Sequence, residues 1–183
     1  MSDPVSALNG ASFQGFATIR EIGPLGMITL RAKGLKSLDK AVKTVTGTKV
    51  PAQRRIEVNG DRACGWMSPD EYLLVLPYAG VAEALASLAK SLAGEHHLAV
   101  DVSDARAVFR VEGDRAADVL RKLSPVDFEM LEPGELRRSR TAQVAAAMWK
   151  QDQGFTVVCF RSVAGYVMGL LAHSAAPGSA LRP

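Results

Sequence analysis

The spacing of hydrophobic residues along this chain alternates between two periods, one suited to strands and one suited to helices. Residues 105–111 place apolar side chains at every second position, which is typical of a half-buried strand. Gly113 and Asp114 then open a segment, 116–123, whose apolar residues share one helical face. Asp114 is the expected N-cap, because its carboxylate can accept a hydrogen bond from the first turn, and Pro125 is the expected stop. This stretch predicts a strand, a tight turn and a helix.

The same two periods predict the remaining elements. Gly47 and Gly94 are suited to helix ends, because glycine adopts the left-handed backbone conformation easily. Asn59-Gly60 indicates a two-residue hairpin turn, since both residues tolerate positive φ. Strands are expected at 25–32, 54–58, 61–67, 72–76, 97–102, 138–150 and 155–160, and helices at 35–46, 79–93 and 162–175.

The order of these elements occurs twice. Trp66 and Trp149 occupy corresponding positions, and the same shift carries the apolar stripe of the helix after the first onto the helix after the second. Gly34 and Gly113 correspond at a slightly different shift, each between a strand and a helix. We therefore predict an α+β fold that contains two copies of one strand-and-helix unit, with helices covering the sheets.

The repeat also predicts a domain organisation. Residues 24–176 are expected to form a single globular domain with two similar halves, at about 24–100 and 101–176. Residues 1–23 show no sustained period and are expected to form an N-terminal arm that packs on something or stays loose. Residues 177–183 are expected to be a loose tail.

Composition and charge narrow the class of protein. A net charge of +3, with most Lys and Arg beside acidic residues, does not favour a nucleic-acid binder. The start of the chain lacks the basic and apolar run of a signal peptide, and no apolar stretch is long enough to span a membrane, so we expect a cytoplasmic protein. Cys64 and Cys159 lie in apolar strand patterns and are expected to be buried thiols.

Motifs for cofactors and metals are missing from the sequence. It contains no phosphate-binding P-loop and no dinucleotide fingerprint, so this chain is not expected to bind flavin or NAD by itself. Gly34 and Gly113 are interpreted as turn residues rather than phosphate ligands. His96 and His97 would point to opposite faces of a strand and cannot easily ligate one metal. His173 is interpreted as a complement to a helix dipole. No catalytic, cofactor-binding or metal residue is therefore assigned.

Asp101 and Asp104 leave two interpretations open. The two carboxylates flank Val102-Ser103 and would suit a general-base pair. Asp and Ser also hydrogen-bond their own backbone in turns, which explains the same residues without chemistry.

Basic and aromatic residues give the candidate partner contacts. Arg137, Arg138 and Arg140 form the one basic cluster without neighbouring acids on its strand, and would suit an anion, an acidic partner surface or a nucleic-acid backbone. Edge strands also carry charge to prevent unwanted pairing, so this explanation stays open. Trp66 and Trp149 complete the expected contact set, because indole buries a large apolar area at interfaces.

Several motifs resemble those of one family, the gamma subunits of heterotetrameric sarcosine oxidase. The likeness covers roughly residues 20–176, and the order and spacing of the motifs make it specific. The motifs lie at 65–74, 101–106, 111–120, 123–128 and 159–162, together with the strand from Arg140-Thr141 to Trp149.

This resemblance implies a fold like the folate-binding domain of the glycine-cleavage aminomethyltransferases. It implies membership of an oxidase that demethylates sarcosine to glycine, reduces oxygen to hydrogen peroxide and passes the one-carbon unit to tetrahydrofolate or releases formaldehyde. It further implies alpha, beta and delta partner subunits, with FAD, FMN, NAD and tetrahydrofolate on the large subunits and zinc on the delta subunit. This chain would be a non-catalytic subunit; a stand-alone folate-binding or aminomethyltransferase-like protein is the alternative.

Overall fold

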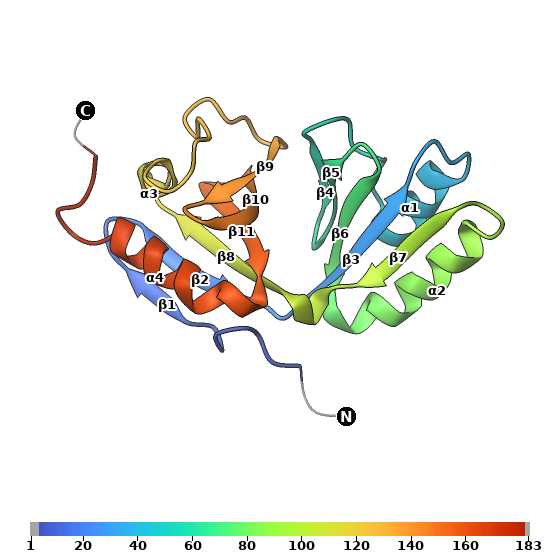
Figure 1. Ribbon diagram of the computed structural model, residues 1–183, viewed down its shortest axis with the longest axis horizontal. Helices are drawn as coiled ribbons and strands as arrows, with labels where there is room; N and C mark the ends of the chain where they lie inside the picture. The colour runs from blue at the N-terminus through green and yellow to red at the C-terminus, as the bar shows by residue number, and fades with distance from the viewer. Residues whose placement is uncertain (1–3, 182–183) are drawn as a thin grey trace. The chain divides into compact units, whose positions relative to one another are not determined.

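The computed structural model describes residues 4–181 and divides the chain into two compact units (Figure 1). Residues 25–103 form the central unit. The terminal unit combines the described residues up to Pro24 with those from Asp104 onward. Each unit contains one antiparallel sheet and two α-helices.

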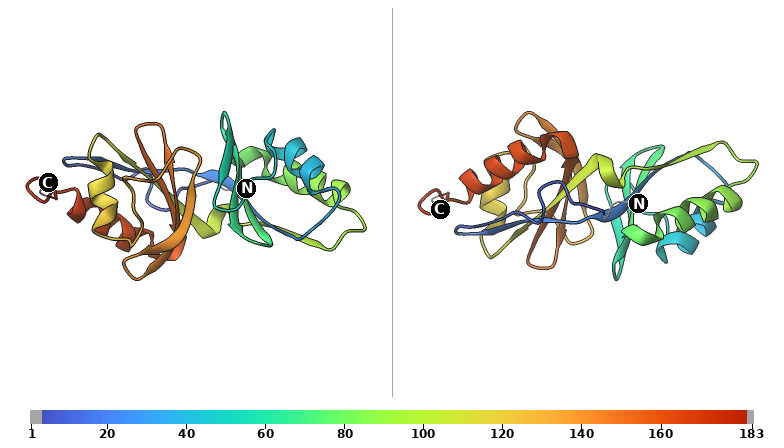
Figure 2. Two further views of the ribbon diagram at one scale, coloured as in Figure 1. Left: turned by 90° about the horizontal axis from the view of Figure 1, so that it is seen from above. Right: turned by 90° about the horizontal axis from the view of Figure 1, so that it is seen from below.

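The central unit is built on a five-stranded sheet in the order β4-β5-β6-β3-β7. Its helices α1 and α2 lie side by side (Figure 2), and both pack on one core with Leu30, Leu74 and Leu88 at its centre. The elements are β3 (Leu25–Ala32), α1 (Leu38–Thr46), β4 (Ile56–Asn59), β5 (Arg62–Ser68), β6 (Glu71–Pro77), the 3-10 turn η1 (Tyr78–Gly80), α2 (Val81–Ser91) and β7 (His97–Asp101).

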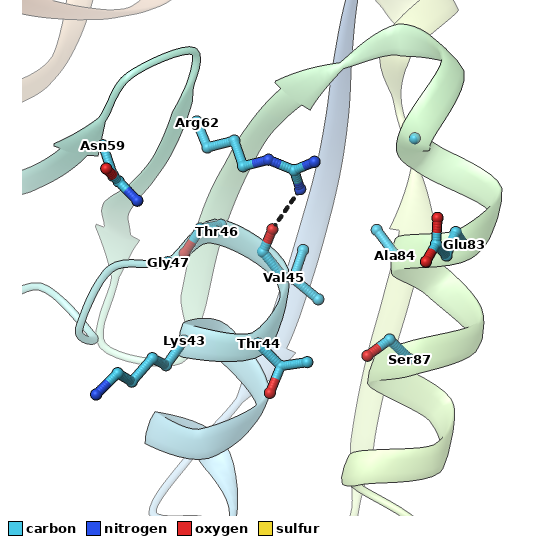
Figure 3. Close-up of a pocket in the computed structure, with 11 residues that line it drawn as sticks. Lys43, Thr44, Val45, Thr46, Gly47, Asn59, Arg62, Glu83, Ala84 and Ser87 are labelled. Atoms are coloured by element: carbon cyan, nitrogen blue, oxygen red, sulfur yellow. Dashed lines mark hydrogen bonds between the residues drawn. The ribbon is translucent and has the colours of Figure 1, made fainter.

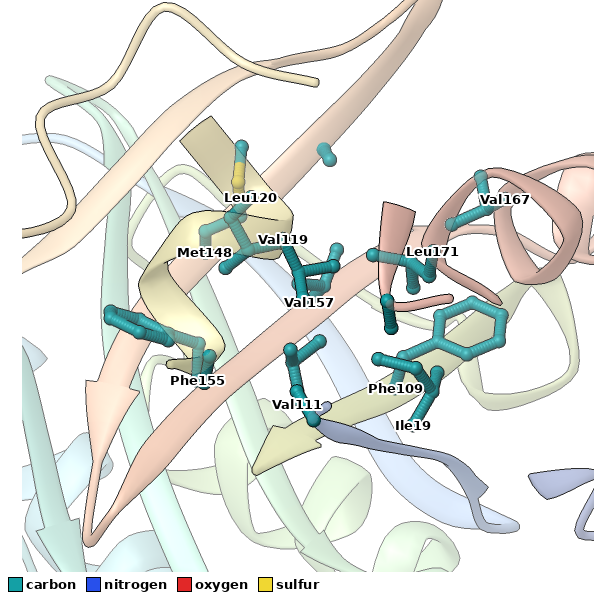
Figure 4. Packing of buried hydrophobic residues seen from close by; sticks show 14 of the residues in the cluster. Ile19, Phe109, Val111, Val119, Leu120, Met148, Phe155, Val157, Val167 and Leu171 are labelled. Carbon is teal, nitrogen blue, oxygen red and sulfur yellow. The ribbon is translucent and has the colours of Figure 1, made fainter. Parts of the chain in front are cut away.

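The terminal unit has a six-stranded sheet in the order β1-β2-β8-β11-β10-β9. Its core contains Ile19, Phe109, Val157 and Leu171, which come from three strands and a helix (Figure 4). The elements are β1 (Ser12–Gln14), β2 (Thr18–Ile22), β8 (Arg106–Glu112), α3 (Ala116–Arg121), β9 (Leu136–Thr141), β10 (Val144–Gln151), β11 (Gly154–Phe160), η3 (Arg161–Val163) and α4 (Ala164–Ser174); a further 3-10 turn, η2 (Ser103–Ala105), precedes β8.

The two sheets share one topology. Reading from one edge, β4-β5-β6-β3-β7 in the central unit corresponds to β9-β10-β11-β8-β2 in the terminal unit, and α1 and α2 correspond to α3 and α4. The predicted duplicated α+β fold is therefore confirmed. The last strand differs in origin, because β7 follows its unit's helices along the chain whereas β2 precedes them, and only the terminal unit carries an additional strand, β1.

Local sequence signals account for several of the observed boundaries. The strand predicted at 25–32 is β3, and α1 ends at Gly47, which has φ 71° and donates its N–H to the Lys43 carbonyl at 2.9 Å. This left-handed residue satisfies a carbonyl of the last turn, as the sequence indicated.

The single strand predicted at 138–150 is wrong, because the chain folds there into a hairpin of β9 and β10. The loop consists of Ala142 and Gln143, and Ala142 has a φ of 51°, a conformation that alanine rarely adopts. Its N–H donates to the carbonyl of Leu123 at 2.7 Å. A contact distant in sequence therefore holds a turn that lacks the usual Gly or Asn.

Two smaller turn predictions are also corrected. The hairpin loop after β4 is Gly60-Asp61 rather than Asn59-Gly60, because Asn59 still pairs with Arg62. The N-cap of α3 is Arg115 rather than Asp114, and its side chain makes no capping hydrogen bond.

Of the two outcomes expected for the N-terminal arm at 1–23, packing or staying loose, the described part shows packing, and it does so as strands. In its described part, β1 and β2 belong to the terminal sheet, with β2 paired to β8. Glu21 is 4% exposed, and its carboxylate accepts hydrogen bonds from Ser6 Oγ at 2.8 Å and from the N–H groups of Ala7 and Gly10 at 3.1 and 2.9 Å. The border between the units falls after Ser103, close to the approximate border at residue 100 that the sequence predicted.

The C-terminal segment is attached to the terminal unit as far as the structure describes it. Lys122 Nζ donates to the carbonyls of Ser174 and Ser179, the first at 2.6 Å, and Arg115 donates to the carbonyl of Leu181 at 2.5 Å. Residues 177–181 are thus held by two cations rather than loose. Residues 1–3 and 182–183, which the expected arm and tail include, lie outside the described residues.

Both cysteines are buried, and we expect neither to react with a thiol reagent such as DTNB at pH 8 while the chain is folded. Burial raises the pKa of the Cys159 thiol to about 11, and burial likewise raises the pKa of Cys64. Since the thiolate is the nucleophile, two independent effects, inaccessibility and protonation, suppress the reaction. Both thiols should react after unfolding in guanidinium, which serves as the control; one fast-reacting thiol in the folded chain would contradict this expectation.

Candidate partner-contact surfaces

The basic cluster lies on β9, which is an edge strand of the terminal sheet. Arg138 and Arg140 are exposed on it, and Arg140 donates to the side-chain oxygen of Gln143 at 3.1 Å. Arg137 is partly buried and forms an ion pair with Glu135 at 2.9 Å. Two of the three arginines are therefore accessible, and both open explanations, edge protection and contact with an acidic surface, are compatible with an edge strand.

The two tryptophans differ in accessibility. Trp149 is 5% exposed, and its ring N–H lies 3.4 Å from the side-chain oxygen of Gln151. Its indole serves the interior of this chain, so direct contact with a partner is not favoured. Trp66 belongs to the central unit, packs against that unit's core and stays partly exposed. The five expected contact residues are thus spread over both units and do not share one exposure class.

The turn interpretation of Asp101 is supported by its contacts. Asp101 Oδ1 accepts hydrogen bonds from the Ser103 N–H at 2.9 Å and from Ser103 Oγ at 2.6 Å. Ser103 Oγ in turn accepts the N–H of Met27 at 2.9 Å, which ties the end of β7 to the start of β3. Asp104 is exposed. This arrangement joins the end of β7 to β3 and accounts for Asp101 without chemistry.

The histidines and glycines occupy structural positions. His97 Nδ1 lies 2.8 Å from the Glu95 carbonyl, and Gly34 and Gly113 have φ of 64° and 117° at the turns after β3 and β8. Within residues 4–181 no group of three or more His, Cys, Asp and Glu side chains is placed to hold a metal ion. Over the same residues, none of the helices is both long and apolar enough to cross a membrane.

The central unit contains a polar pocket of about 400 Å³ between the last turn of α1, the β4–β5 hairpin and the start of α2 (Figure 3). Arg62 is already engaged there, because its Nη1 donates to the Val45 carbonyl at 2.6 Å. Lys43 lines the pocket from α1, and Glu83 and Ser87 line it from α2. With Arg62 counted, the lining carries two cations and the one carboxylate of Glu83. Sequence reasoning did not find it, since its residues come from separate segments without a motif.

A second hollow, of about 350 Å³, lies in the terminal unit beside Gly113 and the β10–β11 turn. Asp114, Glu129 and Asp152 give it an acidic lining, with Lys150 as its one basic residue.

Exposed apolar side chains form the remaining candidate contact surface. Leu98 and Val100 are 55% and 40% exposed on β7, which among the described strands pairs with β3 alone and therefore forms an edge of the central sheet. Alternate residues of a strand share a face, so the two side chains point the same way. The sequence predicted this strand but not the exposure of its side chains, because a short apolar strand is expected to be buried until its neighbouring strands are known.

Comparison with known proteins gives a consistent result. The sequence matches the family described as "Sarcosine oxidase, gamma subunit family" over residues 34–176. A curated relative, the sarcosine oxidase subunit gamma of Corynebacterium sp. (strain U-96), is 34% identical over 141 residues, which cover 74% of this chain and 67% of the relative.

Solved structures share the fold. A chain of the heterotetrameric sarcosine oxidase from Corynebacterium sp. U-96, solved with pyrrole 2-carboxylate, matches with a TM-score of 0.82 and 24% identity, covering 94% of this chain and 91% of that chain. Aminomethyltransferase T of the glycine cleavage system from Bartonella henselae matches with a TM-score of 0.64 and 12% identity, covering 86% of this chain and 45% of its own. The fold predicted by the resemblance is therefore confirmed; at this identity the aminomethyltransferase match concerns fold alone.

Proposed function

Because this chain belongs to the sarcosine oxidase gamma subunit family, we propose that it is the gamma subunit of a heterotetrameric sarcosine oxidase and acts through assembly rather than through an active site of its own. The observation that carries the proposal is the 34% identity to a curated gamma subunit across 67% of that protein. The match in fold to a chain of a heterotetrameric sarcosine oxidase, at a TM-score of 0.82, supports it.

The proposed assembly acts in the cytoplasm and oxidatively demethylates sarcosine to glycine, with production of hydrogen peroxide and transfer of the one-carbon unit to tetrahydrofolate. Its partners are alpha, beta and delta subunits, and FAD, FMN, NAD, tetrahydrofolate and zinc belong to those partners. Within this chain, Asp101 and Arg62 make structural hydrogen bonds, with Ser103 and with the Val45 carbonyl.

The accessible part of the expected contact set is the proposed interface. Arg138 and Arg140 are exposed residues of an edge strand, where an acidic surface of a partner subunit would meet them. Trp66 adds a partly exposed indole in the central unit. Trp149 and Arg137 support this interface from within the terminal unit, the first by packing and the second through its pair with Glu135.

Co-expression with the products of the neighbouring genes is expected to yield one complex. An affinity tag on this chain should retain alpha, beta and delta subunits in equal amounts, and the complex should oxidise sarcosine. The proposal is wrong if the oxidase assembles and turns over normally without this chain while the purified chain remains alone.

A charge reversal sharpens the same experiment. Arg140→Glu is expected to release the partners at a lower salt concentration than the unchanged chain, because a rim charge contributes mainly through screened electrostatics. Lys90→Glu, on the exposed surface of α2, is the matched control and should leave retention unchanged.

A further inference from the structure

Among the described residues, the edges of the two sheets are protected to different degrees. The β9 edge carries the arginine cluster, and β1 is only three residues long. The β4 edge has four residues, and its Glu57 pairs with Lys49 at 3.4 Å. Charge and shortness are the usual ways in which an edge strand avoids pairing with another chain. On β7, in contrast, Leu98 and Val100 are exposed, and the one formal charge, on Asp101, stands at its end.

The duplication shows how the corresponding edge is covered in the other unit. Strand β2 takes the place of β7, since Arg20 pairs with Arg110 of β8 as Leu98 pairs with Arg31 of β3. The outer edge of β2 is occupied by β1 in an antiparallel register, with Phe13 opposite Ile19 and packed against the core. The equivalent edge of β7 has no such strand within residues 4–181.

The exposed side chains of β2 and β7 also differ between the two units. At the position of Arg20, which is exposed and paired with Glu112 at 2.8 Å, the central unit has Leu98. A charged pair suits a surface that remains in water, whereas an exposed leucine beside an exposed valine suits a surface that becomes covered. The edge therefore combines available backbone groups with an apolar strip along one face.

We propose that β7 is a docking edge at which an extended segment of a partner subunit adds an antiparallel strand, in the place that β1 holds beside β2. The inference rests on the proposed function, because the occupant is assigned to another subunit of the same assembly. Main-chain hydrogen bonds would provide affinity, and apolar side chains at alternate positions of the segment would cover Leu98 and Val100. Figure 1 shows β7 (yellow-green) in the central unit, where β3 is its strand neighbour.

A second copy of this chain is the competing occupant. Two β7 strands paired about Ala99 would set Leu98 against Val100 and His97 against Asp101. The solved relative of the same fold belongs to a heterotetrameric enzyme, which favours a different subunit. Self-pairing therefore becomes an outcome that the experiment separates.

The test uses the full chain alone and in the co-expressed complex. Amide hydrogen exchange over 97–101 should be at least about tenfold slower in the complex than in the free chain, because added strand hydrogen bonds protect edge amides. The double variant Leu98→Lys with Val100→Lys should reduce partner retention at least about tenfold, since lysine blocks edge pairing. Val58→Lys, 47% exposed on the opposite edge of the same sheet, is the matched control and should retain partners normally.

The outcomes are distinct. A complex that forms with unchanged exchange over 97–101 overturns the docking edge and leaves the proposed function standing, whereas no complex with the unchanged chain refutes the proposed function itself. A free chain that is dimeric and becomes monomeric in the double variant overturns the partner segment in favour of a second copy. The exchange measurement needs no variant, so a folding defect in the double variant would not obscure the result.

Discussion

Replacing Phe109 with alanine is expected to lower the free energy of unfolding by about 3–5 kcal/mol, the usual cost of removing a large aromatic ring from a packed core. Phe109 is 0% exposed in the middle of β8, and its ring lies among Ile19 and Leu171 (Figure 4). The substitution removes contacts with a strand from the start of the chain and with a helix from its end. Denaturant titration followed by fluorescence would measure the loss, with Trp149 reporting on the same unit.

Phe160→Ala is the control for this prediction. Phe160 ends β11 in the same sheet but is 48% exposed, with the Arg106 guanidinium 4.2 Å from its ring centre. Its removal should cost about 1 kcal/mol or less, since little buried area and one exposed cation–π contact are lost. Equal losses for the two variants would show that Phe109 does not occupy the core of the terminal unit.

The second large effect concerns the N-terminal segment, which Glu21→Ala is expected to release at a cost of about 3 kcal/mol. The carboxylate of Glu21 accepts three hydrogen bonds, from Ser6 Oγ and from the N–H groups of Ala7 and Gly10. Alanine would leave Ser6 Oγ and the Ala7 N–H without this acceptor and the Gly10 N–H with only its longer bond to Ser6 Oγ at 3.3 Å, which costs more than the net value of one hydrogen bond. Denaturant titration should record the loss, and amides of residues 6–11 should exchange faster.

Glu112→Gln provides the comparison for Glu21. Glu112 pairs with Arg20 at 2.8 Å on the partly exposed face of the same sheet, where an ion pair contributes about 1 kcal/mol or less. The variant should therefore leave exchange over 6–11 unchanged. If Glu21→Ala also left those amides protected, the buried carboxylate would not be what holds the segment.

The parts of the fold that the sequence predicted are those governed by neighbouring residues. Strand β3 and the end of α1 at Gly47 follow from apolar spacing and from glycine's tolerance of positive φ. The duplication was also visible, because a repeated core stripe leaves the same spacing twice. The hairpin at Ala142 was not visible, since the turn is held by the distant carbonyl of Leu123.

Glu21 shows the same limit from the polar side. From sequence alone, a carboxylate such as that of Glu21 is expected to be exposed to solvent. Only the folded chain shows the three donors that surround it. The N-terminal segment also shows no sustained hydrophobic period in the sequence, although its strands β1 and β2 belong to the terminal sheet. The prediction of Asp114 as the N-cap of α3 was wrong for a related reason. Residue type alone does not determine where a helix begins, and α3 has Arg115 as its N-cap.

Prediction of the contact residues depended on exposure, which sequence patterns report unevenly. Arginines on a strand indicate an accessible edge, and Arg138 and Arg140 are indeed exposed. An indole suits a core and an interface equally, and Trp149 proved to be 5% exposed. The β7 edge could be recognised only once the strand pairing of both sheets was known. Comparison of β7 with β2 then identifies a strand position that is filled in the terminal unit and that no strand of residues 4–181 fills in the central unit.

The chain order of the terminal unit sets the sequence of events as the protein leaves the ribosome. Strand β2 precedes the whole central unit along the chain, whereas its partner β8 follows that unit, with Thr18 opposite Glu112. Domains generally fold as units during synthesis, so the central unit can fold before β8 is available to pair with β2. Such a distant pairing is entropically slow to form, which makes the joining of β2 to β8 a late step of cotranslational folding.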